Sequence, residues 1–172
     1  NSLGPFSSGV CTYSGGVLNS ASHFLDLLRG LFGNLQLYNS GPIDLIDGDL
    51  QGHFEVGNEA VRVAFNHLPE RLLSHHTLDL VSAKGRLLYD FGGRTVRFWP
   101  SVEDSDFPAY RVFEGAGQEI PSNLRGAMAR VCHSLYQAIN GQPTDLASLD
   151  DSLQTHALID ELRSTMTNYD LA

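Results

Sequence analysis

The segment YSGGVLNSASHFLDLLRGLFG, residues 13–33, decides how this chain folds. Two glycines open it, and apolar residues then recur at steps of three and four, which is the period of a helix that buries one face. Gly33 stands where a glycine commonly ends a helix. The pattern predicts a first helix from Gly15 to Phe32. Its buried face is expected to consist of Leu18, Ala21, Leu25, Leu28 and Phe32.

The apolar period changes to two after this helix, over about residues 43–113, and the turn residues become those of β-hairpins. The pairs Gly57-Asn58, Lys84-Gly85 and Gly92-Gly93 separate the apolar runs. Connections this short join antiparallel neighbours, so a parallel sheet is excluded for this stretch. We expect about six strands, at residues 44–55, 60–67, 77–82, 86–91, 94–99 and 109–114.

Helical spacing returns after the strands. A second helix is predicted from Pro121 to Ile139, and a third over residues 146–162, where Ser148 and Asp151 form a start signal. The order predicts an α+β domain with a predominantly antiparallel, open-faced sheet and helices packed on one face. Either strand register leaves apolar groups on both sides, so we expect the open face to serve self-association.

The composition and net charge of the chain limit the classes of partner that it can bind. The chain has 172 residues, 42% of them hydrophobic, and a net charge of −9, which fits one acidic globular domain. Such a surface repels phosphate backbones and anionic membranes, so we expect neither nucleic acid nor a membrane as partner. The two cysteines form no disulfide framework and no metal-ligand pattern, which favours a reducing, cytoplasmic setting. No apolar run is long enough to span a bilayer.

The first residues are rich in Gly, Ser and Pro and start with Asn1. That composition is typical of a connecting loop and indicates a piece of a longer protein. We therefore expect residues 1–12 to be a linker and residues 13–172 to be the domain.

A polar stripe runs along the first predicted helix. Asn19, His23 and Asp26 are spaced four and three apart, so their side chains share one face. A histidine with an amide and a carboxylate in reach has the parts of a general acid or base. The alternative is a structural role, because buried polar groups are usually paired for structural reasons. For Asp26 we favour that alternative, as a cap or as a partner of Arg29.

Other polar clusters match no recognised site. The segment EGAGQEI, residues 114–120, lacks the third glycine and the parallel strand of a dinucleotide fingerprint, so it is expected to be a loop. Cys132 precedes His133 on a helix, where neighbours diverge, and is expected to pack as a small apolar group. Two clusters are assigned to solvated loops: His67, His75 and His76 with Glu70, and Asp44, Asp47 and Asp49.

The same opening segment resembles the second-domain signature of the Gfo/Idh/MocA oxidoreductases, roughly GGxxxDxGxHxxDxxxxxxG. The strands, the turn at residues 83–87, the Pro-started helix and the Leu-rich last helix extend the likeness over nearly the whole chain. The resemblance implies the fold of a dihydrodipicolinate reductase/glyceraldehyde-3-phosphate dehydrogenase-like C-terminal domain. The matched signature positions are Gly15, Gly16, His23, Asp26 and Gly33, with Asn19 in place of an aspartate.

The resemblance also implies an activity. In that family an N-terminal Rossmann domain holds NAD or NADP, and the C-terminal half shapes the substrate site and the oligomer interface. The reaction transfers a hydride between a sugar, cyclitol or related polyol and the nicotinamide. By that likeness His23 is the proton carrier and Asn19 orients it, while Tyr13, Gly15 and Gly16 contact the substrate. The partner lysine would lie in the absent half, so this chain alone is expected to bind no cofactor or metal and to be inactive.

Two other readings stay open. A standalone, non-catalytic binding or assembly module would share the fold, and the presence of a Rossmann half before Asn1 would decide against it. A cofactor-free hydrolase built on His23 would need Ser20 or Ser22 as its nucleophile, and no nucleophile-elbow motif supports it.

Overall fold

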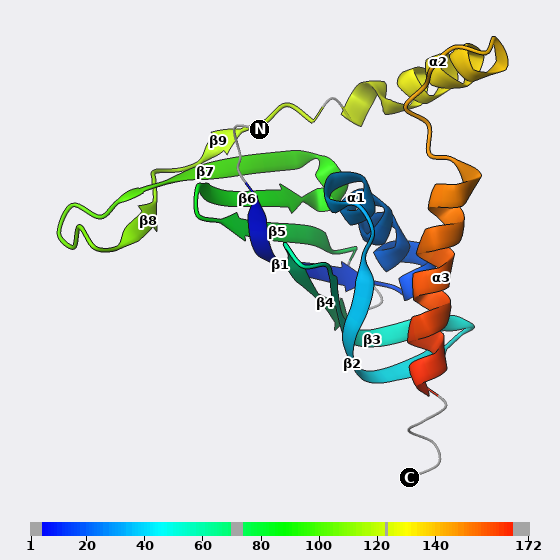
Figure 1. Cartoon of the computed structure of the whole chain (residues 1–172), viewed down its shortest axis with the longest axis horizontal. Coiled ribbons are helices and arrows are strands. Elements are labelled where there is room, and N and C mark those ends of the chain that lie inside the picture. Colours follow the sequence, from blue (N-terminus) through cyan, green and yellow to red (C-terminus); the bar gives the residue numbers. More distant parts are fainter. Residues whose placement is uncertain (1–4, 70–73, 123, 167–172) are drawn as a thin grey trace.

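The computed structural model describes residues 5–69, 74–122 and 124–166 (Figure 1). The strands are β1 (Phe6–Ser14), β2 (Gln36–Ile46), β3 (Asp49–Gly57), β4 (Arg62–Leu68), β5 (His76–Ser82), β6 (Gly85–Asp90), β7 (Thr95–Glu103), β8 (Arg111–Phe113) and β9 (Gln118–Glu119). The helices are a π-helical turn (Val17–Ala21), α1 (Ser22–Phe32), α2 (Ala127–Ile139) and α3 (Leu149–Met166), with short 3₁₀ turns at Phe91–Gly93 and Leu124–Gly126.

One sheet organises the fold. Its strand order is β2-β3-β4-β1-β5-β6-β7-β8, and β9 pairs with β7, which makes nine strands. Every described pair except β1 with β4 is antiparallel. The α+β, predominantly antiparallel prediction is confirmed, but the sheet is larger than the six strands expected.

The prediction has one strand too few in this region because it overlooked a turn. The predicted strand at residues 44–55 is in fact the meeting of β2 and β3 across Asp47-Gly48. Both turn residues have positive φ, 54° and 83°. An Asp-Gly pair with two positive φ angles is a favoured hairpin turn, so the signal was present in the sequence.

β1 corrects the expectation for the N-terminal residues. Residues 6–12, assigned to a linker, form most of this strand, which lies between β4 and β5 at the centre of the sheet. Cys11 and Tyr13 are two residues apart in β1, so both side chains point into the core, and both are fully buried. Between β1 and β4 the chain passes through α1, β2 and β3, and this long connection allows β4 to lie beside β1 in the same direction. Residues 1–4 lie outside the described part of the chain.

Helices α1 and α3 cover one face of the sheet (Figure 1). The predicted face of α1 is buried at Leu25 and Leu28, and α3 adds Leu158, Ile159 and Leu162 to the same core. α3 begins as the sequence predicts, since the Ser148 and Asp151 side chains and backbone amides bond reciprocally. Burial of these side chains removes apolar surface from water and holds both helices on the sheet.

The opposite face of the sheet is open and carries paired charges. Arg62 binds Glu55 at 3.2 Å, and Arg86 binds Asp79 through Nε and Nη2. Val10 lies among them with 43% of its surface exposed. The open face is therefore a polar coat with apolar residues between the ion pairs.

Helix α2 does not pack on the sheet, which corrects the expectation that all helices cover one face. Figure 1 shows it away from the sheet, and none of its residues is buried. Met128 is 74% exposed and Ile139 is 76% exposed. Cys132 is exposed as well, so its expected role as a packed apolar group is wrong. The helical period was correct, but periodicity cannot say what covers the apolar side.

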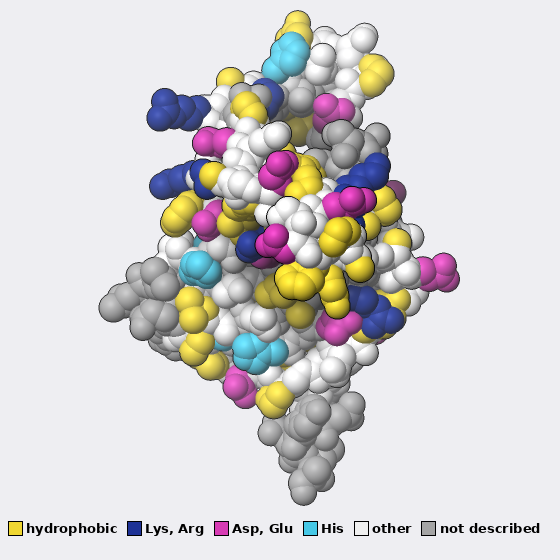
Figure 2. All heavy atoms as spheres, turned by 90° about the vertical axis from the view of Figure 1, so that its left-hand side faces the viewer, with side chains coloured by type: hydrophobic (Ala, Val, Ile, Leu, Met, Phe, Trp, Pro, Cys, Tyr) yellow, Lys and Arg dark blue, Asp and Glu magenta, His cyan; other side chains and the backbone are white. Residues whose placement is uncertain are grey.

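The hairpin of β7 and β8 projects from the other end of the sheet (Figure 1). Phe107 and Tyr110 at its tip contact edge to face at 6.5 Å, and both are largely exposed. Figure 2 views the molecule from this side and shows hydrophobic side chains interspersed with acidic and basic ones. Among the described residues, half of the exposed large hydrophobic side chains lie on this hairpin and on α2.

Candidate functional site

Asp49 of β3 caps the N-terminus of the first helical segment. Its carboxylate accepts hydrogen bonds from the backbone amides of Leu18 (2.8 Å) and Asn19 (3.1 Å). A carboxylate at a helix N-terminus satisfies otherwise unpaired amides and suits the helix dipole. Asp49 was assigned to solvent by sequence, and the structure corrects this, because the residue caps a helix distant in the chain.

The two glycines make this capping possible. A Cβ on Gly16 would overlap the Asp49 carboxylate, and Gly15 has φ of 80°, in the left-handed region. A Cβ there would also come within 3.0 Å of Ser20 Oγ. Both glycines, predicted as substrate contacts, therefore have a structural reason to be glycine: they bring β1 and the helix start close to β3.

Tyr13 lies in the core and not in a pocket. Its side chain is 0% exposed, and its hydroxyl donates to the Gly52 carbonyl at 2.8 Å. Its ring contacts Phe54, Phe65 and His67. Burial raises the pKa of the phenol, so the hydroxyl stays protonated and holds β1 to β3. The expected substrate contact through Tyr13 does not fit this placement.

Asn19 and His23 line one pocket of about 440 Å³, which we call the His23 pocket. Asn19 lies in the π-helical turn and His23 in the first turn of α1, and both side chains are exposed. The spacing of four therefore does place the predicted pair on one wall. The other residues of the pocket are Ser20, Phe24, Leu27, His76, Tyr89 and Gly92.

His76 also lines this pocket, which corrects its assignment to a solvated loop. It begins β5, and its Nε2 lies 3.2 Å from Ser20 Oγ, while its ring stacks on Phe24 at 6.5 Å. Burial lowers the pKa of His76, with smaller contributions from His75 and His23, while a backbone hydrogen bond to Ser14 acts in the opposite direction. The strand period could have found it, since His76 shares a face with the buried Leu78 and Leu80.

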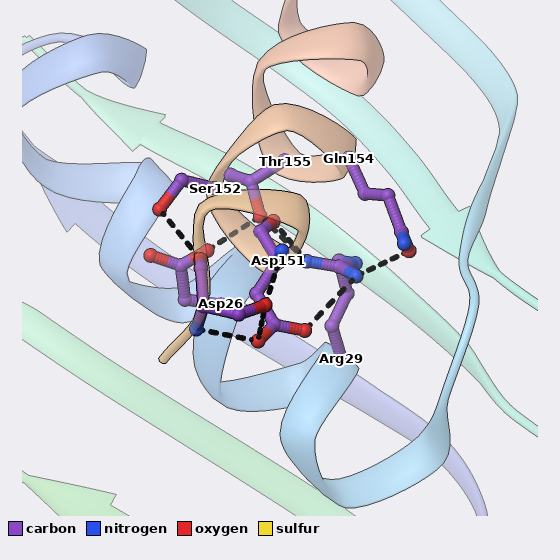
Figure 3. A network of polar contacts seen from close by, with 7 residues as sticks. Asp26, Arg29, Asp151, Ser152, Gln154 and Thr155 are labelled. Atoms are coloured by element: carbon purple, nitrogen blue, oxygen red, sulfur yellow. Dashed lines mark hydrogen bonds and ion pairs between the residues drawn. The ribbon is translucent and has the colours of Figure 1, made fainter. Parts of the chain in front are cut away.

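Asp26, the third member of the polar stripe, serves the packing of α3 (Figure 3). Its carboxylate accepts a hydrogen bond from Thr155. Arg29 donates to Thr155 at 3.1 Å and to the Asp151 carbonyl and Gln154. The structural role favoured for Asp26 is confirmed, but its hydrogen-bond partner is Thr155 of α3 and not the expected Arg29. Asp26 and Arg29 together tie α1 to α3.

The remaining clusters form no site. Gly115 and Gly117 lie in the turn between β8 and β9, in line with the loop expected there, and β9 pairs antiparallel with β7. His67 lies in β4 and packs on Tyr13, so it is not the solvated loop residue expected, and burial lowers its pKa. Glu70 falls outside the described residues. Within the described ranges, no group of three His, Cys, Asp or Glu is placed to hold a metal ion, and no helix is suited to span a membrane.

The geometry of the His23 pocket suits proton transfer and hydroxyl recognition. Two histidines, an asparagine, a serine and a tyrosine line one cavity, and histidine is the usual proton carrier near neutral pH. Such groups can exchange a proton with a bound alcohol or carbonyl and can bind neighbouring hydroxyls.

Comparison with known proteins supports the fold. No family model matches the sequence, and no curated protein matches it either. Among solved structures, a dehydrogenase (MviM) from Clostridium difficile superposes with a TM-score of 0.66 at 6% identity, over 95% of this chain and 55% of that one. An oxidoreductase domain protein from Kribbella flavida gives a TM-score of 0.65 at 13% identity, over 98% of this chain and 58% of that one.

A third similar structure is a levoglucosan dehydrogenase in complex with NADH, with a TM-score of 0.62 at 15% identity, over 97% of this chain and 58% of that one. Identities this low show the fold alone. At that level the expected resemblance to the Gfo/Idh/MocA oxidoreductases is confirmed. This chain spans little more than half the length of the structures it matches.

Proposed function

We propose that this chain is the substrate-binding and oligomerisation domain of an NAD(P)-dependent oxidoreductase that transfers a hydride between a sugar, cyclitol or related polyol and the nicotinamide. The observation that carries the proposal is the His23 pocket. It brings together His23 and Asn19, the pair implied by the signature, in a fold shared with dehydrogenases of about twice this length.

His23 is the proposed proton carrier of this site. Its side chain is exposed into the pocket, where it can reach the hydroxyl or carbonyl of a bound substrate. Asn19, one turn earlier, offers an amide that orients by hydrogen bonding and adds no charge. The backbone amide of Asn19 is held by Asp49, so this wall of the pocket is anchored to β3.

The described residues of this chain do not fit a dinucleotide. The glycine pair that suggested a phosphate loop joins two short strands, β8 and β9, which both run antiparallel to β7, so it lacks the strand-to-helix turn of a dinucleotide fingerprint. NAD or NADP is therefore proposed to bind a separate Rossmann domain, and residues 6–12 belong to the present domain as part of β1. The cofactor supplies the hydride chemistry, and this chain supplies position and proton handling.

Copies of the whole protein are proposed to associate through the open face of the sheet. Val10 lies there between the pairs of Arg62 with Glu55 and Arg86 with Asp79, a mixed pattern typical of protein interfaces. We also propose a cytoplasmic location, which the free thiols of Cys11 and Cys132 support.

The test is the native polypeptide itself. An antibody raised against this chain should detect a species about twice its 18.8 kDa in extracts. That species should reduce NAD or NADP with at least one sugar or cyclitol. A native species of 18.8 kDa with no separate cofactor-binding partner would contradict the proposal and favour a standalone binding module.

A further inference from the structure

A second, larger cavity meets the His23 pocket at the turn Phe91–Gly93. Gly92 of this turn lines the His23 pocket, and Arg94, the next residue after the turn, lines a cavity of about 700 Å³. We call it the arginine cavity. Its lining residues are Arg94, Pro121, Ser122, Leu124 and Arg125.

We propose that the arginine cavity binds a phosphate or diphosphate group of the substrate, whose polyol ring lies in the His23 pocket. This inference rests on the proposed function and deepens it, because it adds a charged group to the class of substrate. The turn shared by the two cavities is the place where one ligand can extend from the first into the second.

The two arginines of the cavity have no counter-ion among the described residues. No Asp or Glu lines the cavity, and neither guanidinium forms an ion pair or a hydrogen bond within the described part of the chain. Four other arginines each pair with a carboxylate, namely Arg29, Arg62, Arg86 and Arg163. Two like charges around one cavity repel each other, so an anion bound between Arg94 and Arg125 is stabilised by both.

The donor groups of the cavity suit phosphate oxygens. A guanidinium presents paired N–H donors that match two oxygens of one phosphate, and the Ser122 hydroxyl adds a further donor. A phosphate monoester carries a charge of roughly −1.5 to −2 at pH 7, which the two arginines balance. The volume exceeds what a single phosphate needs and lies within the range of about 300–1,000 Å³ of ligand pockets, so a diphosphate also has room.

Both walls of the arginine cavity are tied to the first residues of β7. On one side the Arg94 amide donates to the Phe91 carbonyl at 3.4 Å, which closes the turn. Gly93 has φ of 85°, and a Cβ there would overlap the ring of Tyr89, so the turn packs closely on a residue of the His23 pocket. On the other side the Ile120 amide donates to the Val96 carbonyl at 2.8 Å, just before Pro121. The backbone around the cavity is therefore positioned before a ligand binds, which lowers the entropic cost of binding.

Calorimetric titration of the full chain with inorganic diphosphate tests the site itself. Arg94→Gln and Arg125→Gln should each weaken diphosphate binding about tenfold, the effect of one lost charge-assisted hydrogen bond. Arg163→Gln makes the same charge change on α3, where the side chain pairs with Asp160, and should leave binding unchanged. Arg94→Lys keeps the charge but loses the paired donors, and should weaken binding about threefold. Arg94 and Arg125 are both exposed, so the variants are expected to fold.

Two further ligands identify the source of the phosphate. Glucose 1-phosphate, which carries both a ring and a phosphate, should lose about tenfold in affinity in Arg94→Gln and also in His23→Ala, whereas inorganic diphosphate should be insensitive to His23→Ala. Binding of NADPH that depends on Arg94 and Arg125, without binding of glucose 1-phosphate, would overturn the assignment to the substrate.

The inference also fails if diphosphate binds equally to wild type and to both Gln variants, or if neither diphosphate nor glucose 1-phosphate binds. If glucose 1-phosphate binds at the two arginines while the native protein reduces no nicotinamide, the proposed function fails and the phosphate site stands.

Discussion

Helices α1 and α2 carry similar apolar stripes but have opposite surroundings. In α1 the stripe is buried, and Leu28 is 0% exposed, whereas in α2 the corresponding stripe faces outward and Leu135 is 51% exposed. The first helix positions His23 from a packed scaffold, and the second contributes no buried residue. The comparison shows that a periodic pattern predicts a helix, while the cover on its apolar side decides whether the helix stabilises the fold.

The largest predicted difference is in core truncation. Leu28→Ala should lower the free energy of unfolding by about 2–5 kcal/mol, because it leaves a cavity beneath α1. Leu135→Ala, the same change in α2, should cost about 0.5 kcal/mol or less. Urea denaturation of both variants measures the difference. Equal costs would mean that α2 is packed in solution.

The helix starts offer a second contrast. Gly16→Ala should cost about 1–3 kcal/mol, because its Cβ would displace the Asp49 carboxylate. Gly126→Ala, at the start of α2, meets only the end of the Arg130 side chain and should cost about 0.5 kcal/mol or less. In an Asp49→Ala background the Gly16→Ala penalty should shrink. A penalty that stays the same there would argue against the clash as its cause.

The polar junction between α1 and α3 gives a third effect, of about the same size as the second. Thr155→Val removes the hydroxyl that bonds both Asp26 and Arg29, and should cost about 1–3 kcal/mol. Thr144→Val is the matched control, because it loses only exposed bonds, one to the Ser134 carbonyl of α2 and one from the Leu146 amide. Thermal unfolding that leaves the two variants indistinguishable would show that this junction contributes nothing to the attachment of α3.

The smallest predicted effect is on the pH dependence of the free energy of unfolding. Because the pKa of folded His76 lies below its unfolded value of about 6.5, the unfolded chain binds the proton more readily. The contribution of His76 is therefore complete above that value and is lost as the pH falls through the folded pKa. His76→Gln should reduce the loss of unfolding free energy between pH 7.5 and 5.5, and His133→Gln on α2 should not. Parallel pH profiles of wild type and His76→Gln would contradict this.

Local patterns predicted much of the fold and one wall of the site. The helix from Gly15, the hairpins and the Ser148–Asp151 start all follow from contacts between residues close in the chain. The position of β1 depends on pairing with β4 and β5, which lie far away in sequence. His76 in β5 likewise contacts Ser20 of the π-helical turn, which lies far away in sequence. The strand period places His76 on the buried face of β5, but contacts between residues remote in sequence leave no periodic signal, so the pairing of β1 and the partner of His76 emerge only in the folded chain.

The measurement that tests the account most directly is the turnover of His23→Ala in the complete native protein, with NAD or NADP and its best sugar or cyclitol. We predict a fall in kcat of about 10²–10⁴-fold, the usual contribution of a general acid or base, with thermal stability unchanged because His23 is exposed. Turnover equal to that of the wild type would contradict the account, because His23 would then not carry the proton.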